Sequence, residues 1–241
     1  PLSNPTNLFS QAPDVKGLFF KPEGDKFYAA GLYPGNTLSS QTGKVVEYEL
    51  SNPWDVSTIN SPYNPGRITQ YFDVSGSTQL GLPGGPGSGS AQTDPHGLFL
   101  SPDGTRMIII DESLNNISQF NLTTPWHISS STYVASSSFS FSEPRDLTFN
   151  NDGTRMYVSD NALDQIKQFS VPTPYDITSI SGFGSGQLNE ESNADFTNAP
   201  FNITSIEAFS FKPDGRTLII VEERTSTDRL IELELTTPWT I

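Results

Sequence analysis

Ionisable side chains recur at two fixed distances from a glycine that the chain places in a short turn four times. These turn glycines are Gly24, Gly104, Gly153 and Gly215. Eight residues before them stand Lys16, His96, Arg145 and Glu207. Seven residues after them stand Gly31, Asp111, Asp160 and Glu222. Carboxylates suit a hard cation such as calcium and also accept hydrogen bonds from hydroxyl groups. The pattern predicts a ligand-binding set of Lys16, His96, Arg145 and Glu207, and a metal set of Asp111, Asp160 and Glu222.

Two other interpretations of these residues stay open. Acids at strand ends also cap loop amides and pair with nearby cations such as Lys16 and Arg145. His96 could act as a general base beside Asp111, or it could donate a hydrogen bond to a loop carbonyl. The only other histidine, His127, lies far along the chain, so zinc is not expected. The chain has no cysteine, which excludes thiol nucleophiles and disulfides.

The same segment is written four times, and this repetition indicates how the candidate residues are positioned. Residues 97–111 read GLFLSPDGTRMIIID and residues 146–160 read DLTFNNDGTRMYVSD, with weaker copies at 17–31 and 208–222. A period of tens of residues is typical of stacked or radial supersecondary units. Function in such folds lies in the loops rather than in the repeated framework.

The second copy predicts four antiparallel strands. Apolar residues 97–100 and 107–110 flank a Ser-Pro-Asp-Gly turn, residues 117–122 alternate apolar and polar, and a more polar strand follows within 131–141. Four antiparallel strands without helical periodicity are the anatomy of a propeller blade. The fold class we expect is therefore an all-β propeller of four-stranded antiparallel blades.

The spacing of the repeats predicts one domain over residues 1–241 with four blades. The repeats cover roughly 11–80, 92–141, 142–187 and 202–241, with insertions at 61–95 and 181–204. Residues 2–10 could supply the missing outer strand of the last blade and close the ring, because pairing the two termini removes open sheet edges. A fragment of a larger propeller, or two chains that share one ring, is the alternative.

Both sets of candidate residues are expected at one end of the blades. The first two strands of a blade are antiparallel, so the start of one lies beside the end of the other. Both insertions also fall at this end. Their aromatic residues could stack on sugars or anchor a protein, or could pack the insertions against the blades. We predict ligand contacts for Tyr71, Phe196 and Phe201.

A proline followed by an aromatic residue closes each repeat. The pairs are Pro53-Trp54, Pro125-Trp126, Pro174-Tyr175 and Pro238-Trp239. We expect these rings to fill gaps between adjacent blades rather than to stack on a ligand.

Charge and composition limit the partners. The chain has 13 lysines and arginines against 27 acidic residues, a formal net charge of -14, which disfavours nucleic-acid binding. No apolar run reaches 18 residues, so no membrane span is expected. Scarce lysine with abundant Ser, Thr, Asn and Gly favours an extracellular, cell-surface or virion location.

The strings SPDGTRMIIID and NNDGTRMYVSD, followed by a strand such as IKQFSV, resemble YVTN-type and NHL-like β-propeller repeats. The terminal TTPW-x-I string resembles repeats of bacterial secreted and phage-associated proteins. The resemblance implies a propeller scaffold. Proteins with such repeats include surface and adhesion modules as well as metal-dependent lactonases and lyases, so the resemblance does not imply one reaction. The Gly/Pro-rich insertion at 81–89 and the weak first repeat depart from the pattern.

These observations favour a non-catalytic binding or structural module that recognises a protein partner or a glycan. The main alternative is a calcium-dependent, lactonase-like hydrolase that uses the acidic ring of Asp111, Asp160 and Glu222. A third hypothesis is a subunit of a filament or virion that assembles with copies of itself.

Overall fold

The computed structural model describes residues 14–34, 41–59, 71–73, 94–138, 141–185, 188–197 and 200–241. These residues form fifteen β-strands and three single-turn 3-10 helices. No helix in this part of the chain has the length and apolar character needed to span a membrane. The chain divides into two compact units, one of residues 1–107 with 120–133 and one of residues 108–119 with 134–241.

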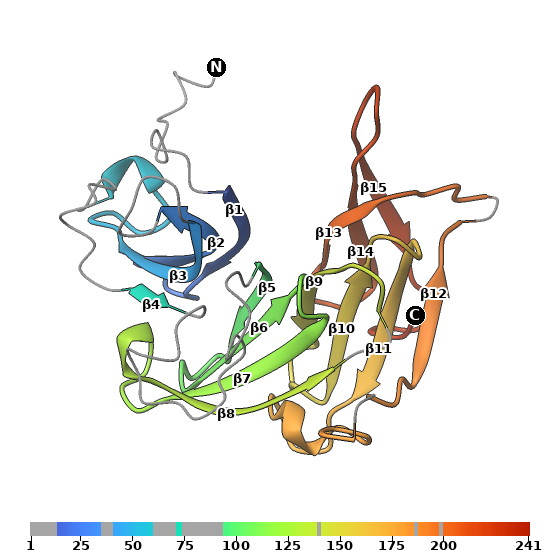
Figure 1. Cartoon of the computed structure of the whole chain (residues 1–241). Coiled ribbons are helices and arrows are strands. Elements are labelled where there is room, and N and C mark those ends of the chain that lie inside the picture. The colour runs from blue at the N-terminus through green and yellow to red at the C-terminus, as the bar shows by residue number, and fades with distance from the viewer. Residues whose placement is uncertain are drawn as a thin grey trace. The chain divides into compact units, whose positions relative to one another are not determined.

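The first unit begins with an antiparallel sheet of four strands in sequence order, drawn from dark blue to cyan in Figure 1. The strands are β1 (Asp14–Phe20), β2 (Lys26–Pro34), β3 (Gln41–Glu49) and β4 (Tyr71–Asp73), and the 3-10 helix η1 (Val56–Thr58) follows β3. Phe20 pairs with Phe27 across the turn. Phe27, Val46 and Tyr48 are buried in the apolar core of this sheet, which explains the apolar alternation of these strands.

A second four-stranded sheet contributes to both units, because the division passes through its strands. Its strands are β5 (Pro95–Leu100), β6 (Arg106–Asp111), β7 (Asn116–Leu122) and β8 (Ser131–Ser138), and η2 (Ile128–Ser130) precedes β8. Met107 through Ile110 are all buried, as expected of an uninterrupted apolar run in a strand covered on both faces.

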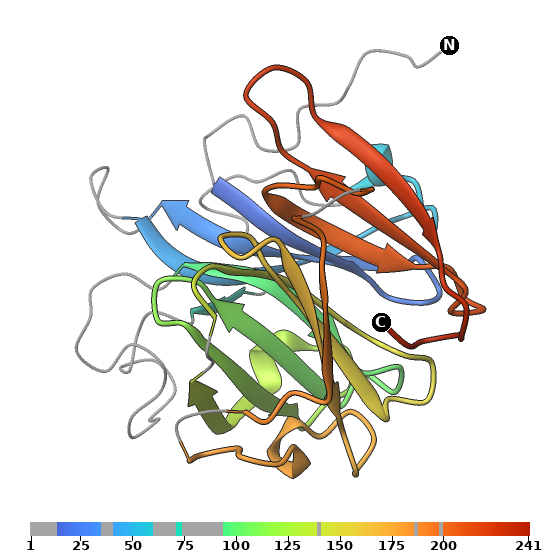
Figure 2. The same ribbon diagram turned by 90° about the vertical axis from the view of Figure 1, so that its right-hand side faces the viewer.

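The second unit contains two further antiparallel sheets. One has the order β12-β11-β10-β9, and the other has the order β13-β14-β15. The first is built of β9 (Pro144–Phe149), β10 (Arg155–Asp160), β11 (Gln165–Ser170) and β12 (Ser192–Asp195), with η3 (Ile177–Ser179) before β12. The second is built of β13 (Ile206–Phe211), β14 (Thr217–Glu222) and β15 (Arg229–Glu234), which run side by side in orange and red in Figure 2.

The expected all-β architecture of antiparallel four-stranded sheets is confirmed for three repeats. The fourth repeat has three strands among the residues that the structure describes. Residues 2–10, predicted to add its fourth strand, lie outside the described residues, as does 81–89 of the first insertion. Blade number and ring closure therefore stay predictions. Part of the predicted insertion 181–204 is in fact a strand: β12 (Ser192–Asp195) pairs with β11, and its polar sequence carries no apolar alternation.

The aromatic residue of each Pro-aromatic pair lies on the turn glycine of its own repeat. Trp54, Trp126, Tyr175 and Trp239 all have positive φ, between 57° and 65°. Their amides donate to the carbonyls of Gly24, Gly104, Gly153 and Gly215 over 2.8 to 3.0 Å. A Cβ on any of these glycines would stand only 2.1 to 2.6 Å from a ring atom. The repeat thus needs glycine twice over, for its φ near +70° and for the space beneath the ring.

Substitution can separate the need for space beneath the ring from the need for a positive φ. Gly104 and Gly184 both have positive φ, but a Cβ on Gly104 meets the Trp126 ring, whereas a Cβ on Gly184 meets nothing within 4 Å. We expect Gly104→Ala to lower the Tm by roughly 5 °C more than Gly184→Ala, because only the first adds overlap to backbone strain. Thermal melts of the two variants make the comparison, and equal losses would contradict the role given to the ring.

Candidate functional site

Charged side chains gather at the strand ends of the second unit around Arg145. Its guanidinium lies 2.6 Å from a carboxylate oxygen of Glu112 and 3.4 Å from one of Glu143. Its Nε lies 3.9 Å from Glu207 Oε2. The structure thus brings together Arg145 and Glu207, two of the predicted ligand-binding residues. Three carboxylates surround one guanidinium, so the cluster keeps a net negative charge.

Asn161 ties this cluster to the loop before β13. Its side-chain amide donates to Glu207 Oε1 over 2.6 Å and to Ser205 Oγ over 3.1 Å. Asp164 accepts a hydrogen bond from the Ser205 amide over 2.6 Å. Ser205 has a positive φ of 61°, and these contacts hold it there. The polar groups at this end of the second unit therefore form a connected network rather than separate surface charges.

A polar recess of about 780 Å³ opens beside this network. Hydroxyl, amide and charged side chains line it: Thr197, Asn202, Thr204, Ser205, Glu223, Arg224, Thr225 and Ser226. Arg224 donates to the Asn202 carbonyl over 2.8 Å and contacts Glu222 over 2.9 Å, which fixes the wall of the recess. The recess therefore offers hydrogen-bond donors and acceptors to a polar ligand.

The predicted metal residues are buried and accept hydrogen bonds from loop amides. Asp160 is fully buried and accepts from the amides of Ser142, Glu143 and Leu163 over 2.9 to 3.3 Å. Asp111 is 4% exposed and accepts from the Leu114 amide over 2.9 Å. These carboxylates hold the loops that follow or precede their strands. A metal role for them stays a prediction.

Glu222, the third predicted metal residue, is enclosed by donors. It is fully buried, its Oε1 accepts from the Thr204 amide over 2.8 Å, and Arg224 and Arg229 both bind the carboxylate. Burial works to raise the pKa of Glu222. Hydrogen bonds from Arg229, the Thr204 amide and Arg224 outweigh burial, and the pKa falls to about 2. Glu222 is therefore ionised at any physiological pH.

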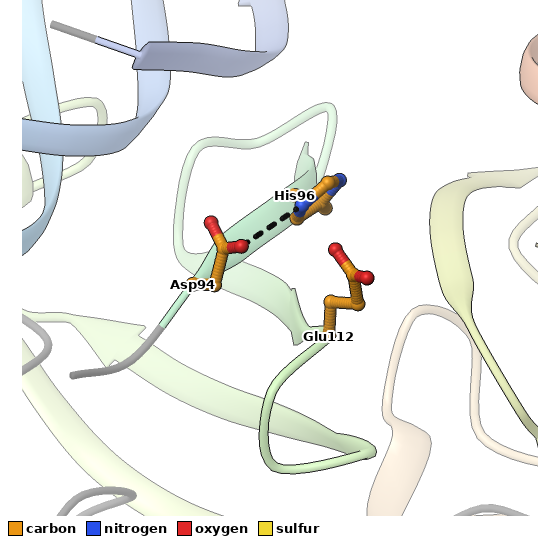
Figure 3. A group of neighbouring side chains, drawn as sticks. All are labelled: Asp94, His96 and Glu112. Carbon is orange, nitrogen blue, oxygen red and sulfur yellow. Dashed lines mark ion pairs between the residues drawn. The ribbon is translucent and has the colours of Figure 1, made fainter.

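The remaining charged candidates lie in the first unit. The Nε2 of His96, which is only 4% exposed, lies 3.4 Å from Asp94 Oδ2, as the dashed line in Figure 3 shows. Glu112, also labelled there, belongs to the second unit and pairs with Arg145. Lys16 lies 3.2 Å from Asp14 at the start of β1. A Cβ on Gly17 would stand 2.0 Å from the His96 carbonyl, so β1 and β5 approach closely there.

The three aromatic candidates have different surroundings. Phe196 is 4% exposed in the apolar core of the second unit, which leaves little of its ring for a ligand. Phe201 contacts the edge of Phe196 with ring centroids 5.7 Å apart and remains 41% exposed. The backbone of Tyr71 belongs to β4, but its side chain lies outside the described residues.

Several residues of the site were not predicted from the sequence. Glu112, Glu143, Arg224 and Arg229 contact the predicted residues. Two of them keep the register of the repeats: Glu143 stands ten residues before its turn glycine, as Asp14 and Asp94 do, and Glu112 directly follows Asp111. Alignment of the repeats could therefore have found these two. Arg224 lies in the loop before β15 and Arg229 is the first residue of β15, and the repeats share no residue type at these positions. Asp164 could have been recognised locally as a turn residue. It has a positive φ of 52° in the turn between β10 and β11, and Asp and Asn are favoured in such turns.

Comparison with known proteins identifies the type of fold. No family model and no curated protein matches the chain. The solved β-propeller domain of Cps50 (Swd1) from Myceliophteria thermophila is 15% identical, with a TM-score of 0.50, over 91% of this chain and 56% of that one. This likeness, together with the antiparallel sheets, supports a propeller-type fold and nothing finer.

Two lactonase structures are also similar at a lower level. The periplasmic gluconolactonase of Pseudomonas aeruginosa has 16% identity and a TM-score of 0.48, over 91% of this chain and 56% of that one. A candidate 6-phosphogluconolactonase from Bacteroides uniformis has 17% identity and a TM-score of 0.49, over 91% and 67%. The chain thus spans little more than half of the length of the first of these.

The ionisation of Glu222 predicts a pH-dependent loss of stability. Its folded pKa lies below the ordinary value of 4.5, so the stabilisation is present above pH 4.5 and is lost as the pH falls towards 2. We expect Glu222→Gln to lower the Tm at pH 7 by roughly 5–10 °C, because two guanidinium groups lose their partner. The variant should also lose less stability than the wild type between pH 4.5 and 2.

The control for this prediction is Glu234→Gln, which removes an exposed carboxylate from β15. Thermal melts from pH 7 to pH 2 should show wild-type behaviour for the control. If the Glu222→Gln and wild-type curves run parallel over this range, the ion pairs of Glu222 contribute nothing to folding.

Proposed function

We propose that this chain is a non-catalytic binding module and that the polar recess of the second unit holds a hydroxyl-rich glycan. The observation that carries the proposal is the lining of the recess. Thr204, Ser205 and Thr225 offer hydroxyls, Asn202 an amide and Glu223 a carboxylate, within a volume of about 780 Å³. Such a lining can donate to and accept from successive sugar hydroxyl groups.

Two further features support a sugar rather than a small ion. Phe201 directly precedes Asn202 and is 41% exposed, so an aromatic face is available beside a residue of the recess. The acidic cluster around Arg145 is linked to the recess through Asn161, which donates hydrogen bonds to both Glu207 and Ser205. This cluster supplies carboxylate acceptors near the recess. An overall charge of -14 disfavours polyanionic ligands.

A metal-dependent hydrolase or lactonase is the second candidate function. The sequence motivates it through the acidic ring of Asp111, Asp160 and Glu222, and two similar structures bear gluconolactonase names. The likeness to those structures is too low to transfer their activity. Binding is favoured because the carboxylates of Asp160 and Glu222 are already used by loop amides and arginines.

An extracellular, cell-surface or virion location belongs to this proposal. It rests on composition alone: lysine is scarce, and Ser, Thr, Asn and Gly are abundant. A glycan on a cell or particle surface would be available to a module at that location.

Glycan binding can be tested with variants that leave the fold unchanged. We expect the wild type to retain members of a glycan array, and Glu223→Gln to weaken retention by about tenfold, because an ionised acceptor is lost without a change in shape. Phe201→Ala should weaken retention to a similar degree. Thr236→Val, outside the recess, is the control, and thermal melts confirm that all variants fold.

A contrary result is equally well defined. The wild type would retain no glycan, and it would hydrolyse a sugar lactone in a calcium-dependent manner that Asp160→Asn abolishes without loss of the folded state. That outcome would replace the binding function with the hydrolase.

A further inference from the structure

Consecutive repeats are connected by one recurring hydrogen bond, which we call the repeat joint. A Glu or Gln in the third strand of one repeat accepts from a backbone amide two residues beyond the aromatic residue of the next repeat. The three joints are Glu47 with the Ile128 amide (3.1 Å), Gln119 with the Ile177 amide (2.9 Å) and Gln168 with the Ile241 amide (3.3 Å). Ile128 and Ile177 are each the first residue of a 3-10 helix, whose amide has no partner within the helix.

The first two joints are buried. Ile128 and Ile177 are fully buried, the Glu47 side chain is only 2% exposed, and Ile241 in the third joint is partly buried. A second hydrogen bond reinforces two of the joints. Tyr28 donates to the Trp126 carbonyl over 2.8 Å, and Tyr157 donates to the Trp239 carbonyl over 2.7 Å. The second and third strands of a repeat therefore together bind the Pro-aromatic turn of the next repeat.

The last repeat carries the acceptor half of a joint. Glu232 in β15 matches Glu47 in β3, and the Oε1 of each carboxylate lies 2.5 Å from the Nζ of a lysine of its own repeat. Glu47 uses Oε2 for the joint. Within the described part of the chain, Oε2 of Glu232 has no hydrogen-bond donor. The Glu232 side chain is 58% exposed, and Leu230 beside it on β15 is 75% exposed.

The first repeat carries the donor half. Val56 is the first residue of η1, the place that Ile128 and Ile177 hold in η2 and η3. Its amide has no acceptor among the described residues. Trp54 is 60% exposed and Val56 is 38% exposed. In the second repeat the matching Ile128 is fully buried, and the matching Trp126 is partly buried and stacks on Phe19 of the first repeat.

We propose that these two halves form a joint between two copies of this chain. Glu232 of one copy accepts the Val56 amide of the other, and Trp54 and Val56 cover the apolar surface around Leu230. The occupant is inferred from the joints within the chain, where a third strand takes a Pro-aromatic turn three times, and the chain itself carries the fourth such turn. The contact is head-to-tail, so it leads either to a closed assembly of copies or to a filament.

Substitutions at the two halves can be chosen to remove the donor or the acceptor of the joint. Val56→Pro removes the N–H and leaves an apolar side chain of similar size, and proline is tolerated at the first position of a helical turn. Glu232→Ala removes the acceptor. Glu232→Gln is the matched control, because Gln119 and Gln168 already serve as acceptors in the internal joints. Thermal melts establish that each variant is folded.

Light scattering across a concentration series measures the association. We expect the wild type and Glu232→Gln to form larger species as concentration rises, and Glu232→Ala and Val56→Pro to associate about tenfold more weakly. A wild type that remains a monomer throughout would overturn the proposal. Association that neither Glu232→Ala nor Val56→Pro weakens would overturn it as well.

Disulfide trapping identifies which copy supplies the turn, since the chain contains no cysteine. Ser57→Cys in one copy and Leu230→Cys in another should form a covalent dimer on oxidation. If the chain with both cysteines forms only an internal disulfide, the joint lies within one chain and the proposal fails. Neither result depends on the glycan recess, so failure here leaves the proposed binding function unaffected.

Discussion

The contact between an aromatic ring and a turn glycine is the constraint on which each repeat depends. The glycine adopts a φ near +70°, and the ring of Trp54, Trp126, Tyr175 or Trp239 occupies the space where a Cβ would stand. The aromatic residue takes a positive φ of its own and donates its amide to the glycine carbonyl. The segment that follows the third strand thereby packs against the turn between the first two strands.

The contact of the Pro-aromatic turn with the glycine also determines where the short 3-10 helices begin. The first amide of such a helix has no acceptor within it, so another group must accept its hydrogen bond. For η2 and η3 that acceptor is a Glu or Gln from the preceding repeat, and Gln168 accepts from the Ile241 amide at the matching position of the last repeat. Contact within a repeat and contact between repeats are therefore coupled: the ring places the turn, and the turn presents the amide.

The opposite end of the strands in the second unit is organised by charge. Burial of Asp160 and Glu222 would be unfavourable if their carboxylates lacked donors, and loop amides and arginines supply them. Carboxylates that hold loops in this way leave the recess lined mainly by hydroxyl and amide groups. The same chemistry that stabilises the loops thus shapes a surface suited to a polar ligand.

Local sequence determined the all-β class, the antiparallel strands and the turn glycines, because alternation, β-branched runs and Asp-Gly turns act over a few residues. Arg145 and Glu207 were named from their place in the repeat, but only the tertiary structure placed them 3.9 Å apart and surrounded Arg145 with Glu112 and Glu143. Those partners stand at fixed positions of the repeat, Glu143 two residues before Arg145 and Glu112 directly after Asp111, but the repeat pattern does not determine which side chains of neighbouring repeats meet. The acceptors Glu47, Gln119 and Gln168 stand at matching positions and could have been aligned, yet their role depends on an amide from the next repeat, which only the packing of one sheet on another brings within reach.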